Sequence, residues 1–196
     1  MTKRILTFIF LILISAVAAF SQTTEQQITK IRAIYGETNT RIDEGLKDKS
    51  SGFHYAAWTV GGKGDGQPWA AVGTIETRDD IWFEGGDPGA GEEEDRVIIR
   101  KIVSSYKGAA DLHSRTEYFF DEEGALIFIF ASSDVDSENG KMIERRFYYS
   151  KGKLIRITRG GKNADANFSA KDLEESRKES SGAEQMRKQY TELLGN

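Results

Sequence analysis

Two similar patterns of hydrophobic and polar residues follow one another between Arg115 and Thr158. Each has an aromatic run, a short polar turn containing glycine, and a β-branched run. Aromatic and β-branched residues suit a half-buried strand, and glycine supplies the positive φ of a tight turn. A shift of 28 residues places Phe119 on Phe147 and Gly124 on Gly152. The pattern predicts two hairpins, hence four consecutive antiparallel strands, with Asn139-Gly140 reversing the chain between them.

The stretch from Leu126 to Ala131 is apolar at every position. Side chains alternate between the two faces of a strand, so neither face of this one is polar. We therefore expect a central strand that is covered on both sides, by a helix on one of them. The same alternation places Leu126 with Phe128, and Leu154 with Arg156.

Residues 22–47 have apolar positions three and four apart, as on the buried side of a helix: Ile28, Ile31, Tyr35, Thr38, Ile42 and Leu46. We expect this helix to cover one face of the sheet. Further strands are predicted for 53–60, 68–77 and 97–106, with 81–83 as a short strand or a continuation.

The C-terminal region begins with a polar, glycine-containing linker at 160–167. Ser169 and Asp172 have the spacing of a capping box, which predicts a helix start. Its apolar positions are sparse, and we expect Ser180-Ser181-Gly182 to break it. The predicted fold is therefore α+β: a single antiparallel meander of about six to seven strands, packed against an N-terminal helix, with a weaker C-terminal helix. The predicted domain covers 22–160, followed by the linker and C-terminal helix at 161–196.

The first 21 residues have the pattern of a secretory signal peptide. Lys3 and Arg4 precede an apolar run that ends in small residues, which is too short for a typical membrane span. Cleavage after Ala18 or Ser21 fits the pattern, and Ser21 is favoured. We expect an exported, soluble protein, periplasmic or extracellular, without a membrane span.

Charge and cysteine content exclude several functions. The net charge of −4 becomes −6 when Lys3 and Arg4 are removed, which argues against a nucleic-acid partner. The chain has no cysteine, so thiol catalysis and thiolate metal sites are excluded. An exported chain without disulfides must rely on its hydrophobic core.

The segments IRAIYGETNTRI, RTEYFFDEEGALIFIF and ERRFYYSKGKLIRIT resemble a set of small secreted bacterial proteins of unknown function. Those proteins share an EYYF-x-x-G-x-L hairpin and an RFYF-x-x-GKLIR hairpin after a signal and a helix. The resemblance covers about half of the mature chain. It implies the same layout and no catalytic residue.

Aromatic residues near the glycine-rich loops are candidates for ligand binding: Tyr55, Trp58, Trp69 and Trp82. Such side chains can stack on a glycan or hold a peptide, although large aromatics more often fill the core. Tyr148 and Arg156 belong to a second candidate cluster, in the last hairpin, which suits an interface.

Acidic residues in the loop before residue 97 could bind Ca²⁺ weakly: Asp87, Glu92, Glu93 and Asp95. Solvation alone explains most such loops. We predict no other cofactor. His54 and His113 are the only histidines, and an ordinary strand-end or surface position explains each of them better than catalysis.

The leading hypothesis is a non-catalytic binding or interaction domain with a protein, peptide or glycan partner. It would use the open face of the sheet or the aromatic loops. A hydrolase built on carboxylates and His54 or His113 is the second hypothesis, and it requires a pocket where such groups converge. A periplasmic carrier of an apolar ligand is the third, and it requires an apolar cavity between helix and sheet.

Overall fold

The computed structural model describes residues 23–48, 52–61, 75–85, 96–108, 112–134 and 142–195. The predicted signal peptide, Trp69, the acidic loop with Asp87, Glu92, Glu93 and Asp95, and the turn at Asn139-Gly140 lie outside these ranges. Most of the strand predicted at 68–77 does as well.

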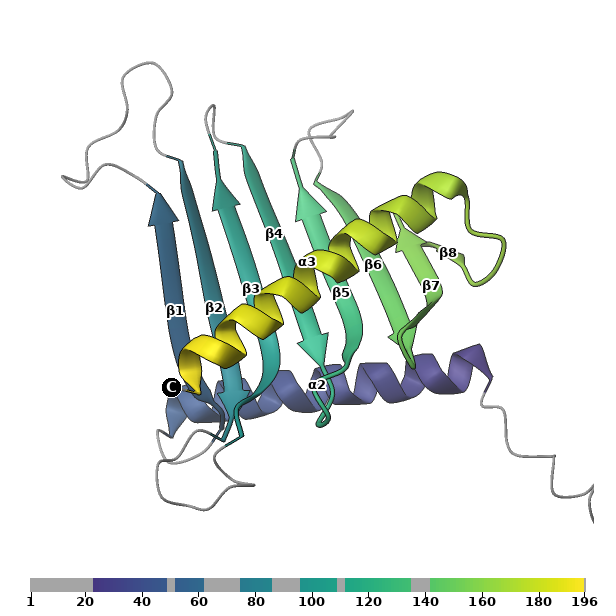
Figure 1. Ribbon diagram of the computed structural model, residues 1–196. Coiled ribbons are helices and arrows are strands. Elements are labelled where there is room, and N and C mark those ends of the chain that lie inside the picture. The colour runs from purple at the N-terminus through teal and green to yellow at the C-terminus, as the bar shows by residue number, and fades with distance from the viewer. Residues whose placement is uncertain are drawn as a thin grey trace, which may run out of the picture.

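The core of the fold is one antiparallel sheet in which the strands lie side by side in chain order (Figure 1). Its eight strands are β1 (His54–Gly61), β2 (Glu76–Glu84), β3 (Ile98–Lys107), β4 (His113–Phe120), β5 (Leu126–Ser133), β6 (Ile143–Ser150), β7 (Lys153–Arg159) and β8 (Lys162–Ala164). The α+β class and the antiparallel meander are confirmed, with one strand more than expected. The additional strand is β8, inside the predicted linker. Gly160 and Gly161 both have positive φ and turn β7 into it.

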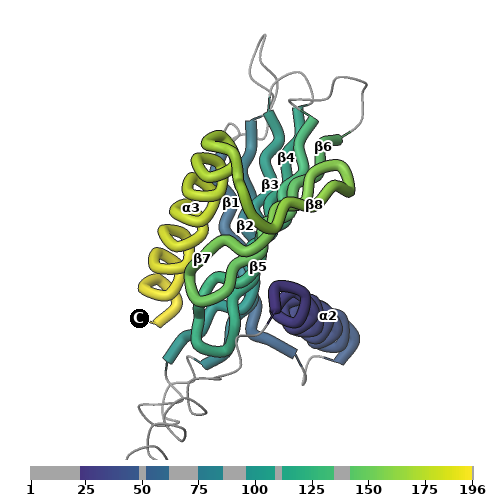
Figure 2. The backbone as a smooth tube through the Cα atoms, turned by 90° about the vertical axis from the view of Figure 1, so that its right-hand side faces the viewer, coloured from purple at the N-terminus to yellow at the C-terminus, as the bar shows by residue number. Residues whose placement is uncertain are grey.

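Two helices cover opposite faces of the sheet, giving three layers (Figure 2). The first is α2 (Thr24–Lys47) and the second is α3 (Ala170–Leu194). Each begins with a capping box, Thr23 with Gln26 and Ser169 with Asp172, which satisfies free backbone N–H groups at the helix start. Among the described residues, neither helix has the apolar composition that a membrane span requires.

The α2 side of the sheet is closed by the predicted isoleucine stripe. Ile28, Ile31 and Ile42 are buried, together with Thr38. Ile28 and Ile31 pack in one cluster with aromatic and aliphatic side chains of the central strands: Phe119, Ile127, Phe128 and Tyr148. Leu46, which the same stripe predicted as buried, is 77% exposed in the last turn of the helix.

The α3 side holds the larger cluster, with Ile102, Phe120 and Phe147 in its centre. The buried residues of α3 are Ser176, Ala183 and Tyr190, seven residues apart. Small side chains let the helix lie close to the aromatic sheet. The predicted break at Ser180-Ser181-Gly182 is wrong, because α3 is continuous across these residues. Tertiary packing outweighs their low helix propensity.

The two hairpins differ by one turn residue, and this corrects the expected equivalences. The β4–β5 register shifts after Phe119, and the β6–β7 register shifts after Tyr148. Phe119 therefore corresponds to Tyr148, an offset of 29, and not to Phe147. The shorter β6–β7 turn is Lys151-Gly152, where both residues have positive φ, as a two-residue type I′ turn requires.

The same bulges overturn two face assignments made from simple alternation. Leu126 packs on the α3 side and Phe128 on the α2 side, because Ile127 is the extra residue of its bulge. Likewise Leu154 packs on the α3 side, whereas Arg156 pairs with Glu25 of α2. Both faces of β5 are buried, as expected, with a helix on each side.

Candidate functional site

A groove lies on the α2 side of the sheet, next to the part of this face that no helix covers. The helix α2 crosses the strands near one end, so the other end of the face stays uncovered by a helix (Figure 1 and Figure 2). The groove has a volume of about 350 Å³, within the range of small-ligand sites. It is lined by Ile31, Arg32, Tyr35, Glu117, Phe128, Phe130, Arg146 and Tyr148.

The walls of the groove are mainly aromatic. Tyr35 of α2 contacts Phe119, with ring centroids 4.7 Å apart, and meets Phe128 edge-on at 5.6 Å. Phe128 in turn packs on Tyr148 at 4.9 Å. Tyr148 is buried, whereas Tyr35 remains 38% exposed at the groove mouth. The groove therefore presents a preformed apolar surface and one accessible tyrosine.

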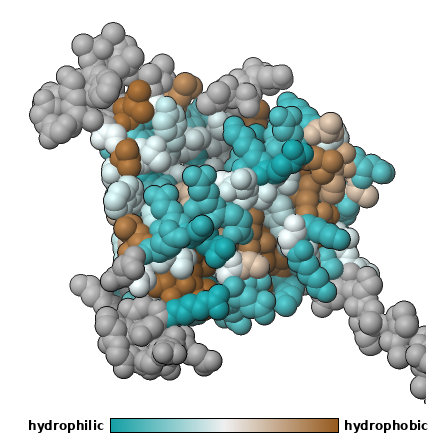
Figure 3. All heavy atoms as spheres, in the orientation of Figure 1, coloured by the Kyte–Doolittle hydropathy of each residue, from teal (hydrophilic) through white to brown (hydrophobic). Residues whose placement is uncertain are grey.

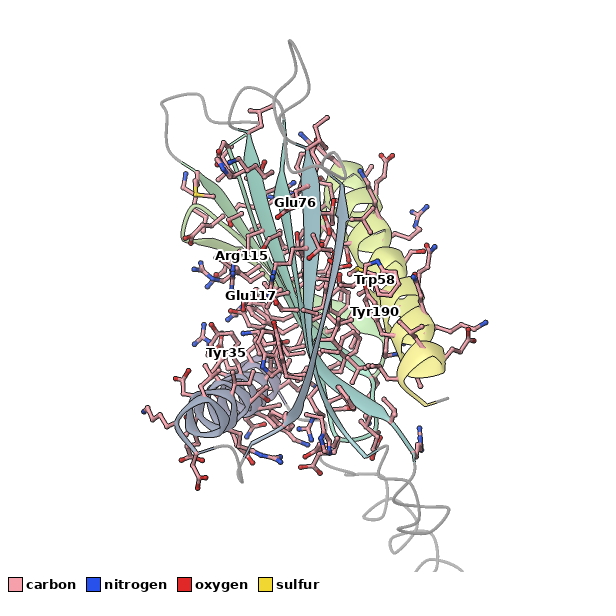
Figure 4. All side chains as sticks on the ribbon, turned by 90° about the vertical axis from the view of Figure 1, so that its left-hand side faces the viewer. Tyr35, Trp58, Glu76, Arg115, Glu117 and Tyr190 are labelled. Atoms are coloured by element: carbon pink, nitrogen blue, oxygen red, sulfur yellow. The ribbon has the colours of Figure 1, made fainter. Side chains whose placement is uncertain are left out.

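Glu117 is the one carboxylate among the groove-lining residues, and it is buried between two cations. Its oxygens lie 3.0 Å from Lys101 Nζ and 3.0 Å from Arg115 Nη2. Burial lowers the pKa of Lys101, while the Glu117 carboxylate favours its charged form. Lys101 also donates to Asn39 of α2 at 2.8 Å. Figure 4 shows Glu117 and Arg115 on the same side of the sheet as Tyr35.

The two other charged residues in the lining are arginines. Arg146 lies over the Phe130 ring, 5.3 Å from its centroid, and pairs with Glu144 at 2.8 Å. Arg32 is exposed on α2, where it interacts electrostatically with Glu25 without a hydrogen bond or salt bridge to another described residue. The charged lining residues are Arg32, Arg146 and Glu117, two positive charges against one negative charge. The groove lining thus has a net charge of +1 on an acidic chain.

A second polar cluster occupies the same face at the β1–β2 edge. The Tyr55 hydroxyl donates to Asp80 at 2.6 Å, and Arg78 donates to both of them. The hydrogen bond to Asp80 raises the pKa of Tyr55. Burial raises the pKa of Asp80, but hydrogen bonds from Arg78 and Tyr55 outweigh it and lower the value. Tyr55 and Trp82 were both predicted as site residues, and their rings lie 5.5 Å apart.

The remaining candidates do not join these clusters. Cross-strand register places Trp58 opposite Asp79, on the α3 side, so Trp58 and Trp82 lie on opposite faces (Figure 4). The tryptophans therefore do not form one platform. Arg156 is 4% exposed and forms ion pairs with Glu25 and Asp165. It joins α2 to the segment after β8, and its guanidinium is occupied by these contacts.

The two histidines lie at opposite ends of the sheet. His54 is at the start of β1, opposite Phe83. His113 is level with the other end of β1, because it lies opposite Lys107, which lies opposite Glu76, the partner of Gly61. His54 packs on the Phe83 ring at 5.4 Å, and His113 lies 3.4 Å from Asp134. Within the described ranges, no three His, Asp or Glu side chains form a group that could hold a metal ion.

Of the predicted site residues that the structure describes, Tyr148 is the one that lines the groove. Glu117 directly precedes the aromatic run of β4 and Arg146 directly precedes that of β6, a signal that could have pointed to this face. Tyr35 follows Ile31 by one helical turn and Arg32 is its direct neighbour, so their position beside the buried stripe was accessible as well. Their convergence with β4–β6 depends on where α2 crosses the sheet.

No family model matches the chain, and the searches of curated proteins and of solved structures found no match. The resemblance of the hairpins to small secreted proteins stays a prediction. The functional argument therefore depends on the geometry of the groove.

Proposed function

We propose that this protein is a non-catalytic binding domain whose groove between α2 and β4–β6 takes a small amphipathic anion. The observation that supports this most strongly is the combination of an aromatic lining with two arginines, Arg32 and Arg146. A ligand with a flat apolar body would pack on Tyr35 and Phe128. Its anionic group would meet Arg32, which forms no hydrogen bond or salt bridge with another described residue and has Glu25 as an electrostatic neighbour.

Binding is favoured over hydrolysis by the chemistry of the lining. Neither histidine is among the described residues that line the groove, and its carboxylate, Glu117, is paired with two cations. General acid–base catalysis needs a group that can exchange a proton near neutral pH at the substrate. A carrier of purely apolar ligands remains the second candidate, because the groove does lie between a helix and the sheet.

A pair of fluorescent probes distinguishes the two candidates. 8-Anilinonaphthalene-1-sulfonate is an aromatic anion, and N-phenyl-1-naphthylamine has the same apolar framework without the sulfonate. We expect the sulfonate to bind more tightly to the wild type. Arg32→Ala is expected to weaken sulfonate binding by about five- to tenfold, the effect of one charge-assisted contact. It should leave binding of the neutral probe unchanged.

Arg187→Ala is the matched control, because Arg187 is a partly exposed arginine on α3, on the opposite face. It should change neither affinity. Equal loss of both probes in Arg32→Ala would contradict an anion contact at this residue. Tighter binding of the neutral probe to the wild type would favour the apolar carrier.

The same proposal includes export. The n-region, the apolar run and the small residues before Gln22 support it. Expression of the full chain followed by mass measurement of the exported fraction tests this. We expect a mature chain that begins after Ser21 or Ala18; an intact chain retained in the cytoplasm would contradict export.

A further inference from the structure

The outer edge of β1 has features of an interior strand. It contains no Lys, Arg, Asp or Glu, and β5 is the one other strand of at least seven residues in the described sheet of which this is true. β5 pairs along both of its edges, whereas β1 pairs along one. The backbone groups on its other edge face no strand of the described chain. Natural edge strands usually carry charges or bulges that prevent further pairing.

The geometry of β1 is also regular. It pairs with β2 over eight consecutive positions without a register shift, whereas β2–β3, β4–β5 and β6–β7 each contain one. Its large side chains are poorly covered: Tyr55 is 52%, Trp58 46% and Val60 59% exposed. Figure 3 shows hydrophobic residues along the edge of the molecule where Figure 1 places β1. A straight, uncharged, apolar edge is a template for another strand.

The opposite edge of the sheet is protected. β8 has three residues, Lys162, Asn163 and Ala164, and all are at least partly exposed. A short edge strand with a lysine is a poor template. Head-to-tail pairing of β1 with the β8 edge of another molecule, which would give an open polymer, is therefore disfavoured.

We infer that β1 pairs antiparallel with β1 of a second copy of this chain, joining two sheets into one across a twofold axis. A second copy brings the same uncharged edge, so no charge on β1 opposes the contact. Opposite residues of an antiparallel pair lie on the same face. Trp58 and Val60 of one copy would therefore lie against the Ala56–Val60 segment of the other, which covers their exposed surface. The contact closes on itself and gives a dimer.

The full mature chain tests this inference by analytical ultracentrifugation. We expect about twice the mass of one chain at high concentration, with dissociation on dilution. The double variant Ala57→Lys and Val60→Lys places a charge at two exposed positions of β1. It should sediment as a monomer and retain the wild-type circular dichroism spectrum. The matched control, Leu173→Lys and Leu193→Lys, changes two exposed positions of α3 and should remain dimeric.

Hydrogen exchange verifies the location of the contact. The β1 amides should be more protected in the dimer than in the monomeric lysine variant, with α2 and α3 unaffected. A wild-type monomer at all concentrations would overturn the inference, including the case in which the edge binds an unrelated extended peptide. A dimer that survives the lysine substitutions would overturn it as well. The groove lies on β4–β6, so probe binding by the lysine variant reports on the proposed ligand site separately.

Discussion

The two helices cover the sheet in different ways. On one face, α2 buries isoleucines near one end of the strands. On the other face, α3 runs diagonally across the strands and buries Ser176, Ala183 and Tyr190. Here sheet tyrosines reach the helix: the Tyr149 hydroxyl lies 2.9 Å from Ser176 Oγ. Small helix residues and hydroxyl contacts hold α3 close to the sheet at Ser176, Ala183 and Tyr190, although a cavity of about 310 Å³ lies between α3 and the turns of the two hairpins. On the other face, large side chains at one end of α2 border the aromatic groove.

The difference shows where a binding surface can arise in a two-faced sheet. The α3 side uses its polar groups for internal contacts, as in the hydrogen bond from Tyr190 to Asp79. On the α2 side, Tyr35 and Arg32 extend beyond the apolar cluster and reach the uncovered part of the sheet. Four substitution experiments probe this contrast, from the largest expected effect to the smallest.

Neighbouring phenylalanines of β4 test whether the two faces are separate packing units. Phe119 and Phe120 are both 0% exposed, and they belong to the α2 and α3 clusters respectively. Alanine at either position should lower the free energy of unfolding by about 3–5 kcal/mol. Hydrogen exchange should become faster in α2 for Phe119→Ala and in α3 for Phe120→Ala. Equal acceleration in both helices would contradict separate units.

The ion pair beneath the groove is the next largest contribution. Glu117→Gln leaves Lys101 buried, with a side chain 8% exposed, without its carboxylate partner. The expected loss is about 3 kcal/mol in urea-induced unfolding. Replacing both residues, Lys101→Met with Glu117→Leu, should recover most of that loss because no buried charge remains. A single variant as stable as the wild type would show that the pair is not desolvated.

The hydroxyl contacts of the α3 side should be individually weaker. Tyr190→Phe removes the donor to Asp79, whose other oxygen has no partner in the described structure. We expect a loss of about 2 kcal/mol, since the acceptor is a buried carboxylate. Tyr149→Phe removes a bond to neutral Ser176 and should cost about 1 kcal/mol. Urea unfolding measures both; the reverse order would contradict the role given to Asp79.

Acidification should remove a stabilising contribution on the α2 side and add one on the α3 side. Burial raises the pKa of Glu84, but hydrogen bonds from Arg41 of α2 and from Arg100 outweigh it and lower the value. Its contribution is present above the unfolded pKa and is lost as pH falls through the folded pKa. Burial raises the pKa of Glu179 on α3. The stability from its protonated form is present below the unfolded pKa and is lost as pH rises through the folded pKa.

Glutamine variants separate these effects. Glu84→Gln should destabilise the protein at neutral pH and reduce its loss of stability in acid. Glu179→Gln should stabilise it above the folded pKa of Glu179, because it removes a buried charge. Thermal unfolding between acidic and neutral pH gives both curves. Parallel pH profiles for the wild type and either variant would contradict the assignment for that residue.

The sequence predicted which helices and strands form better than it predicted the register in which the strands pair. Alternation and turn glycines identified the meander, and helical spacing identified the buried isoleucines of α2. The one-residue difference between the turns after Phe120 and Tyr149 was not visible in that pattern, because a bulge changes side-chain direction without changing residue type. Gly160 and Gly161 form the turn into β8, but the polar composition of this segment predicts a linker instead of a strand.

The candidate site was predictable only in part. Tyr148 stood out as an aromatic residue in a strand, but its partners come from α2 and from β4 and β5. Which strands α2 crosses is set by packing between distant residues, such as Ile31 against the β5 side chains. No local pattern records that choice. Arg156 shows the converse, since its polar–aromatic setting indicated an interface while its ion pairs are internal.

The most direct test of the groove is a nuclear magnetic resonance titration of the full mature chain with 8-anilinonaphthalene-1-sulfonate. Saturable shifts should appear for Ile31, Arg32, Tyr35 and Phe130, and they should be absent from Ser176, Ala183 and Tyr190 on the α3 side. Shifts confined to the α3 side, or no saturable shift at the groove, would contradict the account.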